Sequence, residues 1–431
     1  MCSYPTHQIP AAACKQISNL FPLLLLLTFI LIILELRCRW VEVFTLLGEE
    51  NSFRAFGGKL KDHTATDLAA TATTAALQSA GLSPEQVDTA ICGNVSSTSV
   101  AGPYIARHMA LQAGVKESTP CLTVNRLCGS GFQSVLNGAQ EIQLKEAEVA
   151  VCAGSENMSM APYILRGARF GTKLGVDLKL EDSLWATLTD HGIKTPMGVT
   201  AENLAAKYKL TREECDQFAL SSQQRWSAAN EDGRFEKEMV SIILKSKKGD
   251  EEFKVDEHPK STSLEKLAKL PTVFKKDGTV TAGNASGICD GAGSIVLASE
   301  DAVKANNLKP LAKLLGYQVS GCDPHIMGIG PVPAIRLLLE RTGYTLGDID
   351  MVEINEAFAP QTLACMKELG LDHSKTNVNG GAVALGHPVG ASGSRITAHL
   401  CYELQRTQKK LAIGSACIGG GQGIALLLER C

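Results

Sequence analysis

The sequence predicts an α/β fold in which strands are covered by helices. From about Val41 onward, short runs of strand-forming residues alternate with stretches in which apolar residues recur at helical spacing. The chain has 431 residues, of which 45% are hydrophobic and 20% are charged. This composition excludes a disordered chain and a small disulfide scaffold, and a net charge of −3 lacks the basic footprint of a nucleic-acid binder.

In the first half, strands are expected at 87–95, 121–125 and 148–155, and a helix is expected at 65–82. A more polar region of mixed charge follows at about 158–283. Because apolar residues continue through it, we expect an insertion with its own helices and loops rather than a linker.

In the second half the alternation resumes, with strands expected at 350–358, 375–381, 410–417 and 423–429 and a helix at about 391–406. Both halves contain a strand that ends in Val-Asn, a turn of small residues and a helix. This internal echo supports a duplication moderately, because chance produces such similarity fairly often.

The N-terminal end differs from the rest of the chain. Residues 20–34 form an uncharged apolar run that would span about 22 Å as a helix, less than the ~30 Å of a hydrocarbon core. Only Lys15 precedes the run, and no A-x-A cleavage site follows it. A foreign extension or mispredicted exon, a membrane anchor and a targeting segment all remain open, so residues 1–40 are treated as an atypical hydrophobic extension.

The fourteen cysteines include no C-x-x-C pair, so the sequence predicts no structural zinc site, no thioredoxin-type site and no other metal site. One of them, Cys128, follows a predicted strand and precedes a predicted helix. At a helix N-terminus the dipole and free N–H groups favour a thiolate, so we expect its pKa to lie below the usual ~8.5. A buried structural cysteine is the competing interpretation.

Three further residues have a chemical context. His387 stands beside a proline among glycines, where it suits a cleft and can accept a thiol proton. Cys417 ends an apolar run before Gly419, whose N–H can face a ligand. Asn355 ends another strand and either hydrogen-bonds an oxyanion or water, or caps the strand.

The ordered segments NRLCGSG, NEAF, GHPVGASG and CIGGGQG resemble the thiolase family. The resemblance runs from about Val43 to the C-terminus, roughly nine-tenths of the chain. The stretches RFGTKLGVDLKLEDSLW, DEHPK and MGIGPVPA are most similar to the mitochondrial 3-ketoacyl-CoA thiolases, which are acetyl-CoA acyltransferases of fatty-acid β-oxidation.

The resemblance implies a five-layered, duplicated α/β/α/β/α fold with an inserted loop domain. It implies an N-terminal domain at 41–300, with the loop domain at about 158–283, and a C-terminal domain at 308–431. It also implies a homodimer or homotetramer in the mitochondrial matrix and no nucleic-acid partner. Membrane contact through residues 20–34 stays open.

The implied reaction is thiolytic cleavage of 3-ketoacyl-CoA, and its reverse Claisen condensation, through an acyl-cysteine. Coenzyme A is then a co-substrate, and no cofactor is permanently bound. By resemblance Cys128 is the nucleophile, His387 its base and Cys417 the second acid/base. Asn355 holds an oxyanion-hole water, and the N–H groups of Cys128 and Gly419 form the other hole.

Three more positions, Lys260, Thr262 and Ser286, fall where the family contacts coenzyme A. Lys260 replaces the usual arginine, which predicts weaker coenzyme A binding, because lysine keeps the charge but lacks the bidentate fork. The family's early R-T-P-x-G is replaced at 49–54, which leaves the first strand without its usual sequence.

Three other functions compete with this interpretation. A β-ketoacyl synthase would place a histidine at Cys417 or Asn355, so CIGGGQG argues against it. A biosynthetic acetoacetyl-CoA thiolase shares all four motifs, but the FGTKLG–EDSLW stretch favours the degradative form. A non-catalytic, membrane-anchored acyl-CoA-binding relative is opposed by the intact set of two cysteines, asparagine and histidine.

Overall fold

The computed structural model describes residues 43–51, 54–245 and 249–431. Its strands are β1 (Val43–Asn51), β2 (Arg54–Ala55), β3 (Thr89–Gly93), β4 (Cys121–Val124), β5 (Val149–Asn157), β6 (Tyr163–Leu165), β7 (Leu180–Asp182), β8 (Thr189–Asp190), β9 (Thr195–Pro196), β10 (Met239–Val240), β11 (Ile242–Leu244), β12 (Glu251–Phe253), β13 (Cys289–Ser299), β14 (Ala312–Gly321), β15 (Met351–Ile354), β16 (Leu411–Ile418) and β17 (Gln422–Arg430).

The helices of the same part of the chain are α2 (Ala65–Ala80), α3 (Ile105–Gln112), α4 (Ser130–Gln143), α5 (Ser183–Thr187), α6 (Met197–Tyr208), α7 (Arg212–Glu231), α8 (Leu264–Ala268), α9 (Glu300–Ala305), α10 (Pro331–Thr342), α11 (Ala359–Leu369), α12 (Ala382–Leu385) and α13 (Ser392–Thr407). Short 3-10 turns are η1 (Pro84–Gln86), η2 (Gly102–Tyr104), η3 (Pro324–Ile329), η4 (Leu346–Asp348) and η5 (His373–Lys375).

The strand order is the same in the two halves. The main sheet runs β15-β16-β17-β14-β1-β13-β5-β3-β4. Outward from the central β14–β1 pair, each half has two antiparallel pairings and then a parallel one, β13–β5–β3 in one half and β17–β16–β15 in the other. This repeated order is the structural form of the internal echo in the sequence.

The repeat extends to individual side chains. The Asp88 carboxylate accepts the backbone N–H groups of Glu148 and Val149 at 2.9 and 3.0 Å. The Asp350 carboxylate accepts those of Lys410 and Leu411 at the same two distances. In each half this aspartate therefore fixes the start of a buried strand, β5 or β16, against its parallel neighbour.

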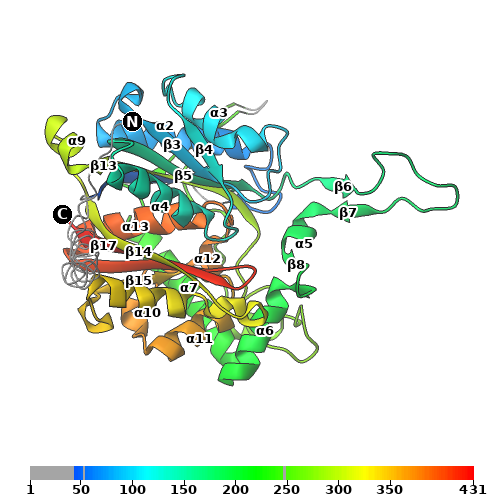
Figure 1. The fold of residues 1–431 in the computed structure, drawn as a ribbon. Helices are drawn as coiled ribbons and strands as arrows, with labels where there is room; N and C mark the ends of the chain where they lie inside the picture. The colour runs from blue at the N-terminus through cyan, green and yellow to red at the C-terminus, as the bar shows by residue number, and fades with distance from the viewer. Residues whose placement is uncertain (1–42, 52–53, 246–248) are drawn as a thin grey trace, which may run out of the picture. The chain divides into compact units, whose positions relative to one another are not determined.

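The elements form five layers (Figure 1). Helices α2 and α3 cover one outer face, α10 and α11 cover the other, and α4 and α13 lie between the two halves of the sheet. The α/β class and the thiolase-like layering expected from the sequence are confirmed.

Two glycines bring the central helices together. A Cβ on Gly393 of α13 would lie 2.1 Å from the Phe132 backbone nitrogen, and one on Gly131 of α4 would lie 2.6 Å from that of Ser394. Backbone therefore packs directly on backbone at the N-termini of both helices. The loops that carry Cys128 and His387 immediately precede these two helices.

The structure differs from the sequence-based expectations at one strand and forms another whose sequence is unusual. The first strand forms despite its unusual sequence, because β1 pairs antiparallel with β13 and β14, with Val43 opposite Ser299 and Leu314. The strand expected at 375–381 is wrong. In the described structure this segment contributes one parallel bridge, from Thr376 to Val352, and then turns. The amide of Asn377 holds the Ile354 backbone in that turn, which ends the ladder.

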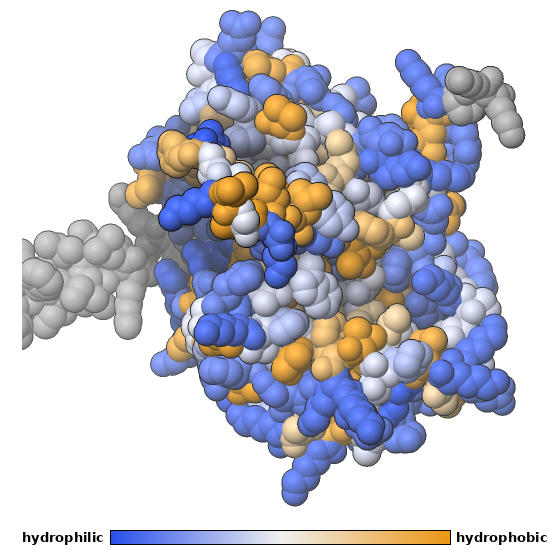
Figure 2. All heavy atoms as spheres, turned by 90° about the vertical axis from the view of Figure 1, so that its right-hand side faces the viewer, coloured by the Kyte–Doolittle hydropathy of each residue, from blue (hydrophilic) through white to orange (hydrophobic). Residues whose placement is uncertain are grey.

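The region between β5 and β13 carries short hairpins and the helices α5 to α8. Its β6–β7 hairpin projects from the body of the protein (Figure 1). Large apolar side chains on it, including Phe170 and Leu174, are almost fully exposed. Figure 2 faces this side and shows hydrophobic side chains gathered near its middle.

The apolar run at 20–34 lies outside the described residues. Among the residues that are described, no helix has both the length and the apolar character to span a membrane.

Candidate active site

The turn between β4 and α4 carries Cys128. Leu127 adopts a left-handed φ of 46°, and Gly129 is the N-cap residue of α4. The Ser130 hydroxyl fixes this turn, because it accepts the Arg126 N–H at 2.9 Å and donates to the Leu127 carbonyl at 2.7 Å. The thiol is therefore held just before a helix N-terminus, where the sequence placed it.

The Cys128 turn packs on the end of β16. The Gly419 backbone N–H lies close enough to the Cys128 sulfur to lower the pKa of the thiol. A Cβ on Gly129 would meet the Ile418 side chain at 2.5 Å, so only a glycine lets the two segments approach this closely. A backbone donor and a nucleophilic atom that are far apart in sequence thus share one site.

The Cys128 thiol has a raised pKa. Burial raises it to about 11 and the Glu156 charge adds to the rise, although the N–H groups of Gly419 and Cys128 itself act in the opposite direction. The expected lowering is wrong because desolvation of a thiolate outweighs the stabilisation by the helix N-terminus and N–H donors. In this structure Cys128 is a neutral thiol at physiological pH.

Glu156, at the end of β5, is a buried carboxylate that the sequence did not reveal. It accepts the backbone N–H groups of Val95 and Ser96 at 3.0 Å and that of Gly390 at 3.2 Å. Burial raises its pKa to about 7 despite these bonds. Glu156 therefore joins the loop after β3 to the loop that carries His387, close enough to Cys128 to affect its ionisation.

Cys417 is fully buried near the end of β16, among Met327, Ala357, Met197 and Phe358. Burial raises the pKa of its thiol well above the usual value, and a thiolate at Cys128 would raise it further. The two thiols therefore influence each other electrostatically.

His387 is held on three sides. Its Nε2 lies 3.2 Å from Nδ2 of Asn355, and its Nδ1 lies 2.6 Å from the Ser392 hydroxyl. Its backbone N–H donates to the Gly287 carbonyl at 2.9 Å. Burial lowers the pKa of the imidazole to about 4, so His387 is neutral at physiological pH and can accept a proton.

The His387 loop and the Cys128 turn meet at one apolar cluster. Val389, two residues after His387, is buried in this cluster, and the Cys128 side chain packs against it. The structure therefore brings Cys128 together with Gly419, brings Asn355 together with His387, and joins the two groups through this cluster.

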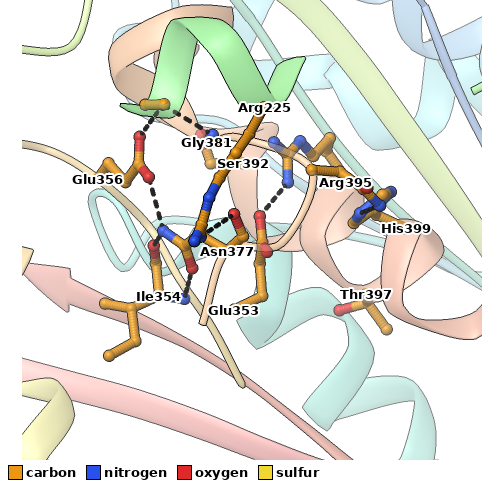
Figure 3. Close-up of polar contacts among 12 residues, drawn as sticks. Arg225, Glu353, Ile354, Glu356, Asn377, Gly381, Ser392, Arg395, Thr397 and His399 are labelled. Atoms are coloured by element: carbon orange, nitrogen blue, oxygen red, sulfur yellow. Dashed lines mark hydrogen bonds and ion pairs between the residues drawn. The ribbon is translucent and has the colours of Figure 1, made fainter. Parts of the chain in front are cut away.

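Asn355 is placed by the end of β15. Its backbone N–H donates to the Ser415 carbonyl of β16 at 2.9 Å. The next residue, Glu356, is buried and accepts the Ser222 hydroxyl at 2.7 Å and the Asn377 amide at 2.8 Å (Figure 3). Glu356 therefore fixes the backbone from which Asn355 reaches His387, and it ties this loop to α7.

The three expected coenzyme A contacts fall in two places. Ser286 lies beside the Asn355 loop, where its hydroxyl donates to the Ala357 carbonyl at 2.9 Å. Lys260 and Thr262 line a separate pocket of about 200 Å³ together with Trp226. A lysine at the rim of such a pocket suits a phosphate group.

Three aromatic side chains that the sequence did not single out form a row toward Cys417. Phe358 packs against Cys417, and the Phe274 ring meets it edge-on at a centroid distance of 6.3 Å. Trp185 stacks on Phe274 at 6.4 Å and is half exposed. The row leads from the surface of the inserted region to the thiol.

Within the described ranges, no group of three or more histidine, cysteine, aspartate or glutamate side chains is arranged to hold a metal ion.

Comparison with known proteins agrees with this geometry. The family profile "Thiolase, N-terminal domain" matches residues 48–301, and "Thiolase, C-terminal domain" matches residues 308–430. The chain belongs to the thiolase family. Cys128 lies within the first match, and Asn355, His387 and Cys417 lie within the second.

Similar thiolases include the mitochondrial 3-ketoacyl-CoA thiolase of Homo sapiens, which is 61% identical over 388 residues, 90% of this chain and 98% of the relative. An acetyl-CoA acetyltransferase of Pseudomonas aeruginosa is 46% identical over 395 residues, 90% of this chain and 99% of that protein.

Solved structures of thiolases have the same fold. A crystal structure of human mitochondrial 3-ketoacyl-CoA thiolase in complex with CoA superposes with a TM-score of 0.89 at 60% identity, covering 91% of this chain and 98% of that one. An acetyl-CoA acetyltransferase of Bacillus anthracis gives 0.89 at 43% identity, covering 91% of this chain and 99% of the other.

Proposed function

We propose that this thiolase cleaves 3-ketoacyl-CoA with coenzyme A, giving acetyl-CoA and an acyl-CoA shortened by two carbons, and that it also runs the reverse condensation. Coenzyme A is a co-substrate of this reaction. The observation that carries the proposal is the packing of the Cys128 turn on the end of β16, because it places the backbone N–H of Gly419 close enough to the sulfur to lower the pKa of the thiol and so puts an oxyanion donor beside a nucleophile. The name of the human relative at 61% identity supports the degradative substrate class.

In the first half-reaction the Cys128 sulfur attacks C3 of the ketoacyl chain as His387 takes the thiol proton. The N–H groups of Cys128 and Gly419 stabilise the oxyanion that forms at C3, and one such donor is typically worth about 3 to 4 kcal/mol. The C2–C3 bond then breaks, an acyl-Cys128 thioester remains, and Cys417 protonates C2 of the departing enolate. The Asn355–His387 side of the site would stabilise the enolate oxygen.

In the second half-reaction Cys417 takes the proton from the thiol of coenzyme A. The resulting coenzyme A thiolate attacks the thioester carbonyl, the acyl group leaves Cys128 as acyl-CoA, and the released Cys128 thiolate takes its proton back from His387. Both half-reactions therefore use Cys128 as the carrier of the acyl group, and Cys417 donates a proton in the first and takes one in the second.

The pKa values of Cys128 and His387 indicate at which stage of the reaction the Cys128 thiolate forms. The values of about 11 for Cys128 and about 4 for His387 make a resting thiolate–imidazolium pair unfavourable by several kcal/mol. Proton transfer from Cys128 is therefore coupled to substrate binding or to attack on C3. Stabilisation of the oxyanion then supplies much of the rate acceleration.

For substrate binding, we assign the nucleotide end of coenzyme A to the pocket of Lys260 and Thr262, and its thiol end to the neighbourhood of Ser286. The rings from Trp185 to Phe358 offer the acyl chain an apolar surface between the exterior and Cys417.

The test is a thiolysis assay with 3-ketoacyl-CoAs of graded chain length. The wild-type chain should release acetyl-CoA, and Cys128→Ala should neither release it nor form a covalent acyl adduct by mass spectrometry. Cys431→Ala, which changes an exposed thiol at the C-terminus, is the matched control and should remain active. Acyl-enzyme formation by Cys128→Ala would overturn the assignment of the nucleophile. Activity with acetoacetyl-CoA alone would favour the biosynthetic alternative.

We also propose that the protein is a homodimer or homotetramer of the mitochondrial matrix, as the mitochondrial relatives suggest. The exposed apolar hairpin β6–β7 favours self-association, because a monomer seldom exposes so many large apolar side chains. Light scattering on the wild-type chain tests the oligomeric state, and a monomer at micromolar concentration would contradict the proposal.

We also propose that residues 1–40 are an extension, that residues 41–300 form the N-terminal domain and that residues 308–431 form the C-terminal domain. If this division is correct, removal of residues 1–40 should leave thiolysis intact.

A further inference from the structure

The Ser392 hydroxyl occupies a position that the proposed chemistry does not use. Ser392 is the first residue of α13 and is buried. Its Oγ lies 2.6 Å from Nδ1 of His387 and 3.3 Å from the Pro388 carbonyl oxygen. The hydroxyl therefore stands between a ring nitrogen and a backbone acceptor.

The protons on His387 can be assigned from its neighbours. The Asn355 amide nitrogen, a donor, lies 3.2 Å from Nε2, so Nε2 must offer its lone pair. A neutral imidazole carries one N–H, which is then on Nδ1 and donates to Ser392 Oγ. The Ser392 O–H is left to donate to the Pro388 carbonyl, so every group in this chain of bonds has a partner.

We propose that Ser392 is a positioning residue that, together with the Asn355 amide on the opposite ring nitrogen, holds His387 in the tautomer with the proton on Nδ1, so that Nε2 carries a lone pair and no hydrogen. The inference rests on the proposed role of His387 as the base, because only an Nε2 without a hydrogen can take a proton from Cys128. In the opposite tautomer Nε2 carries a hydrogen and cannot act as a base.

The surrounding backbone restricts other arrangements. The ring lies on a short loop whose ends are fixed, by the His387 N–H on the Gly287 carbonyl at 2.9 Å and by the Ala391 N–H on the Pro388 carbonyl at 2.8 Å. Gly386 adopts a φ of 94°, and a Cβ there would meet the Cys289 sulfur at 2.6 Å. With the loop fixed in this way, Ser392 acts on the proton position rather than on the placement of the loop.

The control comes from the same helix. Thr397 is buried like Ser392 and belongs to the same helix (Figure 3). Its hydroxyl donates to the Gly393 carbonyl of that helix at 2.7 Å. Thr397→Val removes a buried hydroxyl from α13 without a change at His387. Ser392→Val and Ser392→Thr form a second matched pair, since the two side chains have nearly the same shape and only threonine keeps the hydroxyl.

The first experiment is ¹⁵N NMR of histidine-labelled wild-type protein, with His387→Asn used to assign the signal. The Nδ1–H tautomer is expected in the wild-type protein and a mixture or the Nε2–H tautomer in Ser392→Ala. An Nε2–H signal in the wild-type protein, or an unchanged Nδ1–H signal in Ser392→Ala, overturns the proposal. Neither measurement needs a substrate, so a failure of the proposed function is recognised separately, as absence of thiolysis in the wild type.

The second experiment is kinetic. Ser392→Ala and Ser392→Val should lower kcat at least about tenfold with little change in KM, because the base is lost while binding groups stay in place. Ser392→Thr should restore kcat, and Thr397→Val should match the wild type. A kcat of Ser392→Ala within twofold of the wild-type value, or an equal loss in Thr397→Val, would contradict a specific role for this hydroxyl.

Discussion

The backbone N–H of Gly419 lies close enough to the Cys128 sulfur to lower the pKa of the thiol, although the two residues belong to opposite halves of a duplicated fold. In the proposed function, the first half supplies the nucleophile Cys128, and the second half supplies the Gly419 N–H, the imidazole of His387 and the thiol of Cys417. Catalysis therefore depends on how accurately the two halves pack, which several substitutions can test.

Cys417→Ser should slow both C–C cleavage and condensation, by about 10²-fold, because a serine hydroxyl is a much weaker acid than a thiol at the same position. Stopped assays in the two directions measure this. Equal rates for the variant and the wild-type protein would remove Cys417 from the acid/base role, and an acyl-enzyme should still form on Cys128.

Glu156→Gln should lower the free energy of unfolding by about 1 to 3 kcal/mol. Both carboxylate oxygens accept backbone N–H groups, and a glutamine must turn its NH₂ toward one of those donors. Loss of the negative charge should also lower the pKa of Cys128. Urea unfolding measures the first effect, and the pH dependence of alkylation of Cys128 measures the second.

The control for Glu156→Gln is Glu181→Gln, which changes a carboxylate paired with Arg166 on the exposed hairpin at 2.6 Å. An exposed ion pair contributes roughly 0 to 1 kcal/mol, so this variant should be nearly as stable as the wild type. Equal destabilisation by the two substitutions would show that the buried contacts of Glu156 contribute no more to the free energy of unfolding than an exposed ion pair does.

His387 should make the fold sensitive to acid. Its pKa is about 4 in the folded protein against 6.5 for an unperturbed histidine. Between these values the unfolded chain binds a proton that the folded chain does not, so its contribution to stability is complete above pH 6.5 and is lost as the pH falls toward 4. The loss amounts to about 3 kcal/mol.

Because other groups titrate in the same range, the measurement compares wild-type protein with His387→Asn by urea unfolding at pH 7 and pH 4.5. The variant should lose less stability than the wild type between the two pH values. An identical loss would mean that His387 is protonated as readily in the folded as in the unfolded state.

Gly393→Ala should prevent normal packing of α13 on α4 and should destabilise the protein by about 3 kcal/mol or more, since its Cβ would lie 2.1 Å from a backbone nitrogen that cannot move alone. The melting temperature in thermal unfolding and the rate of thiolysis should both be lower than in the wild-type protein. Gly347→Ala is the control, because its Cβ would meet the nearest atom at 3.6 Å, an ordinary contact. Normal stability of Gly393→Ala would show that the helices can separate without cost.

Much of the fold was predictable because its strands are short, apolar and separated by helices with clear periodicity. The sequence also singled out Cys128, His387 and Cys417, because each lies in or directly before a turn rich in small residues. The strand expected at 375–381 failed because Asn377 bonds the neighbouring backbone with its side chain, which local strand propensity does not reveal.

The ionisation of Cys128 and the part played by Glu156 could not be predicted. Local sequence places the thiol at a helix N-terminus, which favours the thiolate. Burial comes from distant segments, including the end of β16 and the cluster around Val389, and it dominates. The contacts of Glu156 likewise join segments that only the complete fold brings together.

The meeting of α4 and α13 through bare glycine backbone has a consequence for how this enzyme can evolve. Where side chains separate two helices, each replacement of a residue shifts the spacing a little, and such shifts accumulate over many generations. Here, as long as Gly131 and Gly393 are kept, main-chain atoms set the distance between the two helices. The remainder of the interior can therefore change its residues extensively while sulfur and imidazole keep their separation.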